Sequence, residues 1–368
     1  MEKKVIYKLS YVILLMSGLL SAACQHHQSI SSKEEGDTIS LRYARNLTMV
    51  QYKDRLEVFQ RNPWDTTKVL NHYTIVQKKG KYPNEVIVPL QKAAVFTSVH
   101  CALLQELGAE TSIGGVYDLQ YIHLPFIEQN IKAGSIQDLG NAMNPNIEHV
   151  MELHPDALMP SPFENSGGYG RLEQLGIPII ECADYMEVNP LARAEWMRFY
   201  GRLFGKAERA DSLFLQIEQS YLALRKNAMQ AKTHPKLICD IPYSGQWMLP
   251  GHGSTMGQMY NDAGANYVFN DLEGAGSIPL SIEHVLDRAL TADIWIFKHH
   301  GPITRKQIYQ DSPLLKNVPA SMWFCDTSTS GFYEETPFHP ERLLANLIQI
   351  LHPELGIQAE KAYFCPLE

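Results

Sequence analysis

The sequence predicts an α/β protein of two lobes joined by a long helical segment. Strand patterns alternate with helix patterns over residues 86–180 and again over residues 237–351, an arrangement typical of parallel sheets. Between these regions, residues 190–229 show extended helical periodicity. The tetrapeptide Ile-Glu-His-Val occurs in both regions, at residues 147–150 and 282–285, which indicates an internal repeat of the two lobes.

The segment before the first lobe has strand character. Leu47–Val50 and Leu56–Phe59 flank a polar turn at Lys53 and Asp54, which predicts an N-terminal β-hairpin extension. We therefore expect three parts after the N-terminus: a first lobe with this extension over residues 41–189, a linking helix over 190–232 and a second lobe over 233–368. Two helices broken near Gly205 fit the linking pattern equally well.

The surroundings of the two tetrapeptides strengthen the repeat. Asn146 and Ser281 precede the two short helices, and Asn146 suits a helix N-cap. Each helix is followed by an aspartate and an apolar strand, Asp156 before residues 157–159 and Asp293 before residues 294–296. Matching context on both sides argues against a chance match of four residues.

The N-terminus predicts export and lipid attachment. Three lysines precede an apolar stretch at residues 11–20, and small residues at 21–23 lead to Cys24. We expect a signal peptide over residues 1–23, lipid on Cys24 and a flexible, polar tether over residues 24–40. Leu20 lies four residues before Cys24, one more than in the usual lipoprotein signal, and an ordinary cleaved signal with an incidental cysteine is the alternative.

Charge and cysteine content narrow the function. The whole chain has a net charge of −8, and loss of three lysines and one glutamate with the signal leaves −10, which argues against nucleic-acid binding. The other five cysteines are widely spaced, so they predict neither a zinc site nor a redox pair. Most lie in apolar runs and are expected to be buried free thiols, with a disulfide as the alternative.

Four stretches of the sequence resemble the helical-backbone solute-binding proteins of ABC importers for iron-siderophores, haem and cobalamin. The resemblance spans about residues 86–353. It rests on a strand and helix ending in Leu-Gly, an Asn-x-Glu…Pro-Asp segment, a Leu-Gly-Ile-Pro turn, and Gly-x-Ser, Ala-Gly and Ser-x-Glu elements. These stretches are residues 94–108, residues 146–156, residues 175–178, and residues 253–254, 263–265 and 281–283.

This resemblance implies two α/β lobes with parallel sheets, a single long rigid helix between them and a ligand cleft between the lobes. It also implies that Glu148 and Glu283 dock onto arginines of the permease, where solvated helix charges would be the ordinary interpretation of a lone glutamate. The expected partners are an ABC permease and its ATPase subunits. We expect a periplasmic monomer that is anchored to a membrane through Cys24, is no enzyme and has no cofactor.

Ligand contacts are expected on loops at the carboxyl ends of the parallel strands. Aromatic and polar residues on these loops suit a bulky metal chelate, an iron-siderophore, haem or corrinoid, although each aromatic could equally be a packing residue. No resident metal site is expected, because His299 and His300 should point in opposite directions. The candidates are Ser98, Tyr117, Tyr121, Phe163, Tyr169, Tyr243, Trp247, His300 and Tyr333.

Two other functions fit parts of the sequence. One is a periplasmic or surface lipoprotein that captures its ligand without its own permease. The other is a secreted α/β hydrolase, but residues 251–256 resemble its Gly-x-Ser-x-Gly element only superficially, because no glycine follows two residues after Ser254.

Overall fold

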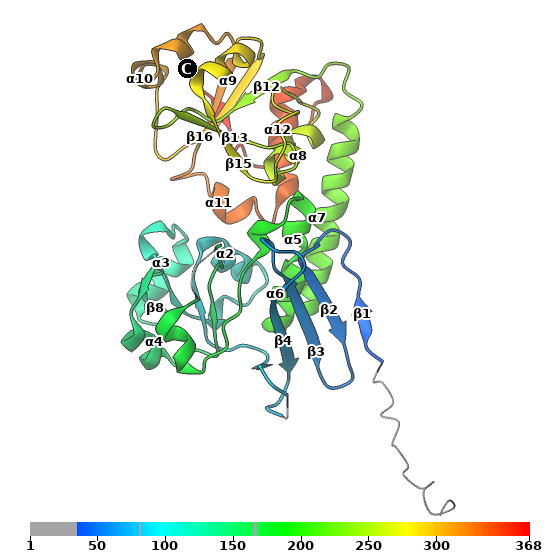
Figure 1. The fold of residues 1–368 in the computed structure, drawn as a ribbon, viewed down its shortest axis with the longest axis vertical. Coiled ribbons are helices and arrows are strands. Elements are labelled where there is room, and N and C mark those ends of the chain that lie inside the picture. Colours follow the sequence, from blue (N-terminus) through cyan, green and yellow to red (C-terminus); the bar gives the residue numbers. More distant parts are fainter. Residues whose placement is uncertain (1–34, 81, 165–167) are drawn as a thin grey trace, which may run out of the picture. The chain divides into compact units, whose positions relative to one another are not determined.

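The computed structural model of the protein describes residues 35–80, 82–164 and 168–368 (Figure 1). The expected signal peptide (1–23) and the lipid site Cys24 lie outside these residues. Residues Asp37–Glu368 form one compact unit. None of the described helices is both long and apolar enough to cross a membrane.

The N-terminal extension is a sheet of five strands in the order β1-β2-β3-β4-β5. The predicted hairpin is confirmed as the antiparallel pair β2–β3, but it is only the centre of this sheet. The expected tether is wrong at its end, because residues 37–39 pair with β2 as an edge strand. The strands are β1 (Asp37–Ile39), β2 (Leu47–Gln51), β3 (Leu56–Arg61), β4 (Val69–Val76) and β5 (Glu85–Ile87).

The N-lobe contains a four-stranded parallel sheet in the order β11-β6-β7-β8. Helix α3 and the hairpin β9–β10 were not predicted from the sequence. The strands are β6 (Ala93–Val95), β7 (Ile113–Val116), β8 (Gln137–Asp138), β9 (Gly140–Asn141), β10 (Asn144–Pro145) and β11 (Ala157–Met159). The helices are α2 (Ser98–Glu106), α3 (Pro125–Ala133) and α4 (Ile147–Leu153).

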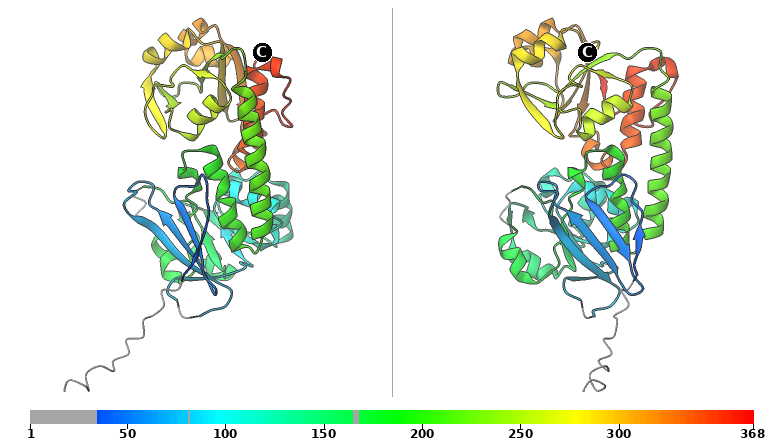
Figure 2. Two further views of the ribbon diagram at one scale, coloured as in Figure 1. Left: turned by 90° about the vertical axis from the view of Figure 1, so that its right-hand side faces the viewer. Right: turned by 45° about the vertical axis from the view of Figure 1, so that its right-hand side comes forward.

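The link between the lobes is three helices, so the expectation of a single helix over 190–232 is wrong. They are α5 (Pro190–Glu195), α6 (Met197–Leu203) and α7 (Ala207–Ala228). The main break lies after α6, where Gly205 adopts a left-handed φ of 66° that ends a helix readily. Helix α7 packs along α12 (Pro340–Leu351) of the C-lobe, as the views in Figure 2 show.

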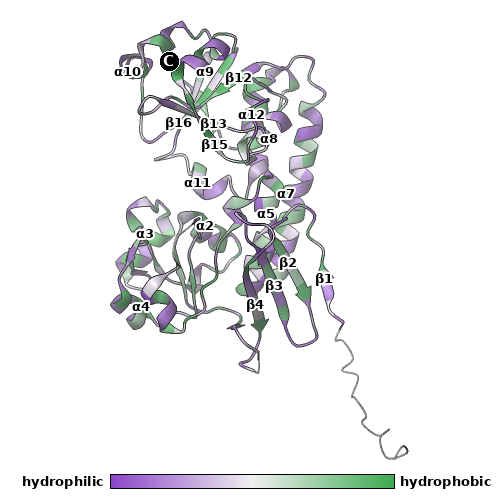
Figure 3. Cartoon of the chain, in the orientation of Figure 1, coloured by the Kyte–Doolittle hydropathy of each residue, from purple (hydrophilic) through white to green (hydrophobic). Residues whose placement is uncertain are grey.

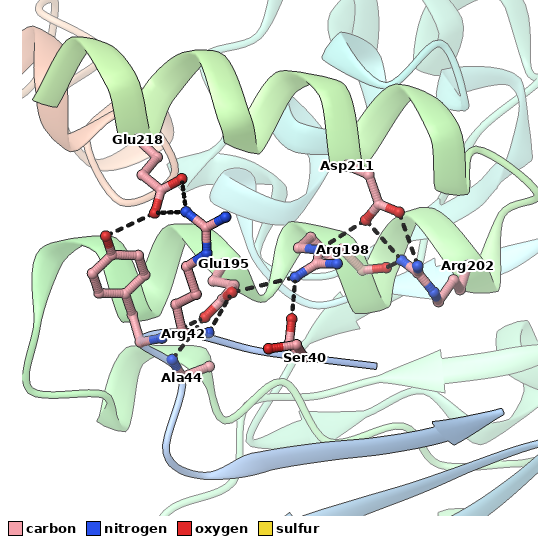
Figure 4. Close-up of polar contacts among 9 residues, drawn as sticks. Ser40, Arg42, Ala44, Glu195, Arg198, Arg202, Asp211 and Glu218 are labelled. Atoms are coloured by element: carbon pink, nitrogen blue, oxygen red, sulfur yellow. Dashed lines mark hydrogen bonds and ion pairs between the residues drawn. The ribbon is translucent and has the colours of Figure 1, made fainter. Parts of the chain in front are cut away.

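Buried carboxylates of the link region hold the N-terminal segment in place (Figure 4). Glu195 on α5 accepts the backbone N–H groups of Arg42, Tyr43 and Ala44 at 2.8–2.9 Å. Glu218 on α7 accepts from Arg42 Nη1 and from the Tyr43 hydroxyl, both at 2.7 Å. We call residues 42–46 with their carboxylate partners the N-terminal clamp.

A third carboxylate completes this clamp. Glu187, which precedes α5, accepts the backbone N–H groups of Arg45 and Asn46, and Trp196 Nε1 donates to it at 2.9 Å. All three carboxylates of the clamp are at most 3% exposed. Burial of charge is costly unless hydrogen bonds compensate it, so the clamp and the link depend on each other.

The C-lobe contains a five-stranded sheet in the order β14-β12-β16-β17-β18, in which only β18 runs antiparallel. A separate two-stranded antiparallel sheet pairs β13 with β15. The strands are β12 (Lys236–Cys239), β13 (Gln246–Pro250), β14 (Asn266–Tyr267), β15 (Ser277–Ser281), β16 (Ile294–His299), β17 (Ser321–Asp326) and β18 (Cys365–Pro366). The helices besides α12 are α8 (Thr255–Asp262), α9 (Ile282–Ala289), α10 (Arg305–Asp311) and α11 (Phe332–Glu335).

Short 3-10 helices connect several of these elements. They are Glu110–Ser112, Leu119–Tyr121, Gly170–Leu175, Asp184–Met186, Pro313–Asn317 and Pro353–Leu355. Apolar residues, green in Figure 3, mark the lobe strands, whereas α7 carries alternating purple and green bands as expected of a half-exposed helix. Four cysteines are buried free thiols and Cys365 is exposed, as the sequence led us to expect of most of them.

The internal repeat has a structural counterpart in each lobe. The Asp156 carboxylate accepts the Lys92 N–H just before β6, and its own N–H donates to the Lys92 carbonyl. Asp293 does the same with Lys236 at the start of β12. Asn146 and Ser281 cap α4 and α9 through their side chains. The two lobes thus repeat one local construction.

Candidate ligand-binding site

A groove lies where the strands of the N-lobe sheet end. It consists of two adjoining cavities of about 650 and 300 Å³, both lined by Thr97, Ser161 and Phe163. Thr97 follows β6, and Ser161 and Phe163 follow β11, the neighbouring strand. Because these strands are parallel, their carboxyl ends share one edge of the sheet, where ligands bind in such folds. We call this pair of cavities the N-lobe groove.

A buried polar cluster forms the floor of the smaller cavity. His100 on α2 lies 2.6 Å from Thr97 Oγ1 through Nδ1 and 2.9 Å from Asp184 Oδ1 through Nε2. Tyr200 donates its hydroxyl to Asp184 Oδ1 at 2.7 Å, and Arg193 donates from Nε to Asp184 Oδ2 at 3.0 Å. Helices α5 and α6 of the link therefore contribute Arg193 and Tyr200 to the floor of the groove.

Electrostatics fix the charge of this cluster. Burial by itself would lower the pKa of His100, but the acidic groups of Cys182 and Asp184 outweigh it and raise the pKa to about 10. Burial opposes ionisation of Asp184, yet His100, Arg193 and Tyr200 lower its pKa to about 2. At neutral pH the imidazolium is therefore a hydrogen-bond donor and cannot serve as a general base for Thr97.

A third cavity, of about 460 Å³, is lined by residues of both lobes. We call it the interlobe cavity; its walls come from α2, from residues 123–125 and from residues 327–342 of the C-lobe. Helix α11 packs against α2 beside it. His339, just before α12, donates from Nε2 to Glu106 Oε2 of α2 at 2.5 Å and from Nδ1 to Glu341 Oε1 at 2.8 Å. A charged contact thus joins the lobes at this cavity.

Comparison with known protein families shows the family to which the chain belongs. A family model described as "Periplasmic binding protein" matches residues 94–321. The chain belongs to this family. Periplasmic binding proteins are solute-binding components of ABC transporters and not enzymes. The matched residues begin at β6, so the N-terminal sheet precedes them.

This periplasmic binding protein is similar in sequence to a lipoprotein and similar in fold to solved binding proteins. An uncharacterized lipoprotein of Methanocaldococcus jannaschii is 24% identical over 364 residues, covering 90% of this chain and 86% of the relative. A periplasmic heme-binding protein of Pseudomonas aeruginosa has a TM-score of 0.58 at 17% identity, covering 76% of this chain and 98% of that one. A petrobactin-binding protein of Bacillus subtilis has a TM-score of 0.56 at 17% identity, covering 82% and 99%. At these identities the structures show the shared fold.

The structure brings some of the predicted N-lobe contacts to the groove. Phe163 lies between its two cavities with 47% of its surface exposed, and Tyr169 lines the larger cavity. Ser98, which is partly buried, follows Thr97 at the start of α2. Tyr121 is 68% exposed on the loop after β7 and lines none of the described cavities. Tyr117 lies in the core and has no exposed surface.

Tyr117 is a core residue of the N-lobe. It is fully buried, with its ring centroid 4.0 Å from that of Phe96, whose side chain lines the groove. Its hydroxyl has no hydrogen-bond partner among the described residues, and burial raises its pKa. The expected direct contact of Tyr117 with ligand is therefore corrected: Tyr117 supports the groove wall from behind.

The predicted C-lobe contacts divide in the same way. Tyr243 is 82% exposed at the tip of a tight turn, where Ser244 and Gly245 have positive φ angles of 51° and 80°. Tyr333 on α11 is 53% exposed. Trp247 is fully buried, and its indole N–H donates to the Cys239 carbonyl at 3.0 Å. The expectation for Trp247 is therefore corrected to a core role, because its strand turns this side chain inward.

The histidine pair after β16 lies at the surface of the C-lobe. His300 is exposed, whereas His299 is partly buried, with Nδ1 2.9 Å from the Gly301 carbonyl oxygen. Within the described residues, no group of three or more His, Cys, Asp or Glu side chains is placed to hold a metal ion.

The two glutamates of the repeat occupy equivalent positions. Glu148 and Glu283 are each the second residue of a short capped helix, α4 in the N-lobe and α9 in the C-lobe. Both side chains are exposed. They are therefore accessible to a partner.

Sequence reasoning missed the polar floor of the groove. His100 and Asp184 are 84 residues apart, and Arg193 comes from the link. The spacing of Thr97 and His100, three residues apart at a helix start, was the one local signal, because such residues share a helix face. Nothing in the sequence connects either of them to Asp184.

Proposed function

We propose that the protein is the substrate-binding lipoprotein of an ABC importer, which captures a metal chelate and delivers it to an inner-membrane permease. The chelate classes considered are iron-siderophores, haem and corrinoids. The ligand contacts proposed are Ser98, Tyr121, Phe163, Tyr169, Tyr243, His300 and Tyr333, with Tyr117 and Trp247 packing behind them. The lipid is proposed on Cys24, and the docking carboxylates are Glu148 and Glu283.

One observation carries the chelate part of this proposal. Large apolar side chains are exposed in segments between the strands of both lobes: Met143, Phe163 and Tyr185 in the N-lobe and Tyr243 and Tyr333 in the C-lobe. Exposing such side chains to water is unfavourable unless a partner covers them. A bulky ligand with apolar or aromatic faces supplies that cover, whereas a bare ion does not.

Docking is supported by the matching carboxylates. Glu148 and Glu283 lie near the positive N-terminal ends of their helices, in exposed positions where a carboxylate can make a paired contact with arginine. One contact per lobe would let the permease recognise both lobes of one binding protein at once. Neither glutamate lines the N-lobe groove, so docking to the permease and binding of the ligand can be tested separately.

This separation gives the test of the proposal. We predict that Glu148→Ala with Glu283→Ala abolishes uptake of the labelled chelate by cells that carry the matching permease, while the affinity of the purified protein for that chelate is unchanged. The control is Glu152→Ala with Asp287→Ala, which removes two exposed carboxylates from the same helices. Normal uptake by the first double variant, or an equal loss in the control, would contradict docking through these glutamates.

A further inference from the structure

The Arg193 guanidinium is only partly used by the protein. It donates from Nε to Asp184 Oδ2, and its two terminal nitrogens have no hydrogen-bond partner among the described residues. The side chain is 24% exposed and lines the smaller cavity of the N-lobe groove. A planar fork of N–H donors is thus turned toward a space that a ligand can enter.

Arg193 shares its carboxylate partner with a second cation. Asp184 already has His100 as a buried cationic partner at 2.9 Å, with Tyr200 as a further donor. The single carboxylate therefore lies between two cations. Burial by itself would lower the pKa of His100, but Cys182 and Asp184 outweigh burial and raise this pKa to about 10, so the imidazole stays charged. Two cations thus share one carboxylate beneath the cavity, so Asp184 compensates the charge of Arg193 only in part.

The rest of the groove does not cancel this charge. The charged residues among the described lining are His100, Arg171 and Arg193 on one side and Asp118 and Asp184 on the other. Asp118 is occupied by the Asn141 side-chain amide at 3.0 Å. The described lining therefore holds one more cationic than anionic side chain, in a protein whose overall charge is −8.

We propose that the N-lobe groove selects a chelate that presents an oxyanion, a carboxylate or a catecholate, and that Arg193 binds this group. The oxyanion would accept two N–H···O bonds from the guanidinium fork, and its negative charge would complete the compensation of Arg193. Thr97 and Ser161 line the same cavity and offer hydroxyl donors beside it. This inference rests on the proposed function, because it requires that the chelate occupies the groove.

Titration with chelates of different charge tests whether the groove prefers an oxyanion. Absorbance and tryptophan-fluorescence titrations of the wild-type protein would use haem, an anionic ferric tris-catecholate, a neutral ferric trihydroxamate and cyanocobalamin. We expect haem or the tris-catecholate to bind at least about tenfold more tightly than either neutral compound, and higher salt to weaken that binding. Haem and the tris-catecholate distinguish a carboxylate from a catecholate as the recognised group.

Variants then assign the selectivity to Arg193. Arg193→Gln should weaken binding of the anionic chelate by about 10- to 100-fold, and Arg193→Lys should restore part of it. The control Arg288→Gln removes a surface-paired cation away from the groove and should leave affinity unchanged. The Gln variant keeps His100 and Tyr200 as partners of Asp184, so folding should survive, and its thermal transition checks this.

The outcomes separate this inference from the wider proposal. Tightest binding of a neutral chelate, or unchanged affinity in a folded Arg193→Gln protein, overturns the oxyanion site while the chelate importer stands. Binding of none of the four compounds overturns both. Should Arg193→Gln fail to fold, the wild-type preference between anionic and neutral chelates decides the matter alone.

Discussion

His339 joins the two lobes through charge. Burial by itself would lower the pKa of this histidine, but its hydrogen bonds to Glu106 and Glu341 outweigh that effect and raise the pKa to about 9. Glu106 belongs to α2 of the N-lobe, and burial of its carboxylate is outweighed by His339, so its pKa is lowered. The pair lies beside the interlobe cavity, where the protonated ring stabilises the contact between the lobes.

This pair predicts a defined pH dependence of stability. The folded pKa of His339 is above its unfolded value of about 6.5, so its contribution is complete below pH 6.5 and disappears as the pH rises through 9. His339→Gln should remove on the order of 2–3 kcal/mol of unfolding free energy at pH 6.5 and almost none above pH 9.5. Urea unfolding across this range measures both.

The control is His252→Gln, which alters an exposed histidine of the C-lobe. It should reproduce the wild-type dependence. A His339→Gln protein whose stability falls with pH as steeply as the wild type would show that this contact contributes nothing to folding.

At the scale of elements, the N-terminal clamp determines how the extension is attached. Residues 42–46 enter no strand, and their backbone N–H groups are satisfied by the carboxylates of Glu187 and Glu195. An unpaired buried N–H costs free energy, so the segment stays in place because these carboxylates compensate several donors at once. The clamp also gives hydrogen-bond donors to carboxylates that the link region buries, in addition to those from Trp196 and Arg198.

We predict that Glu195→Ala lowers the unfolding free energy by about 3–5 kcal/mol, the cost typical of removing one partner from a buried charge network. Urea unfolding of the purified protein gives the value. Glu208→Ala on α7 is the control, because that glutamate is exposed, and its effect should stay within about 0.5 kcal/mol. Equal stability of the two variants would mean that the clamp does not support the fold.

The elements that could be predicted from sequence are those with local signals. Caps and stops defined α4 and α9, and Asp156 and Asp293 marked the strands that follow. The two-stranded sheet β13–β15 gave no such signal, because its strands are short, carry prolines and are 27 residues apart in the chain at their closest pair. The break at Gly205 could be located but not decided, since glycine is tolerated inside helices as well as at their ends.

The site was less predictable than the fold for a physical reason. Tyr117 and Trp247 were predicted as ligand contacts because they follow strands, but a position after a strand does not show whether a side chain faces a ligand or the core, and both are buried. The floor of the groove depends on residues brought together by packing of α2 with the link, as the His100–Asp184 contact shows. Only a three-dimensional arrangement reveals such a cluster.

For the whole molecule, membrane attachment is the remaining proposal to test. We predict that the wild-type protein, expressed in a bacterial host, sediments with membranes, whereas Cys24→Ala is released in the soluble periplasmic fraction. Acyl chains on one residue supply the hydrophobic surface for stable attachment, and loss of the thiol removes the site that carries them. Fractionation followed by immunoblotting measures the distribution.

Cys365→Ala is the matched control, since Cys365 is an exposed free thiol at the other end of the chain. It should remain with the membranes. Membrane association of Cys24→Ala equal to that of the wild type would rule out Cys24 as the anchor.

The clamp has a consequence for how far an anchored molecule can travel from its membrane. Twelve residues separate Cys24 from β1, and a fully extended chain of that length reaches about 40 Å. A chain that runs from the anchor would reach the folded protein first at β1, which pairs with β2 at the edge of the N-terminal sheet, and the clamp then fixes residues 42–46 to α5 and α7. An anchored molecule would stay within that distance of its membrane, and its search for a permease would become diffusion in two dimensions.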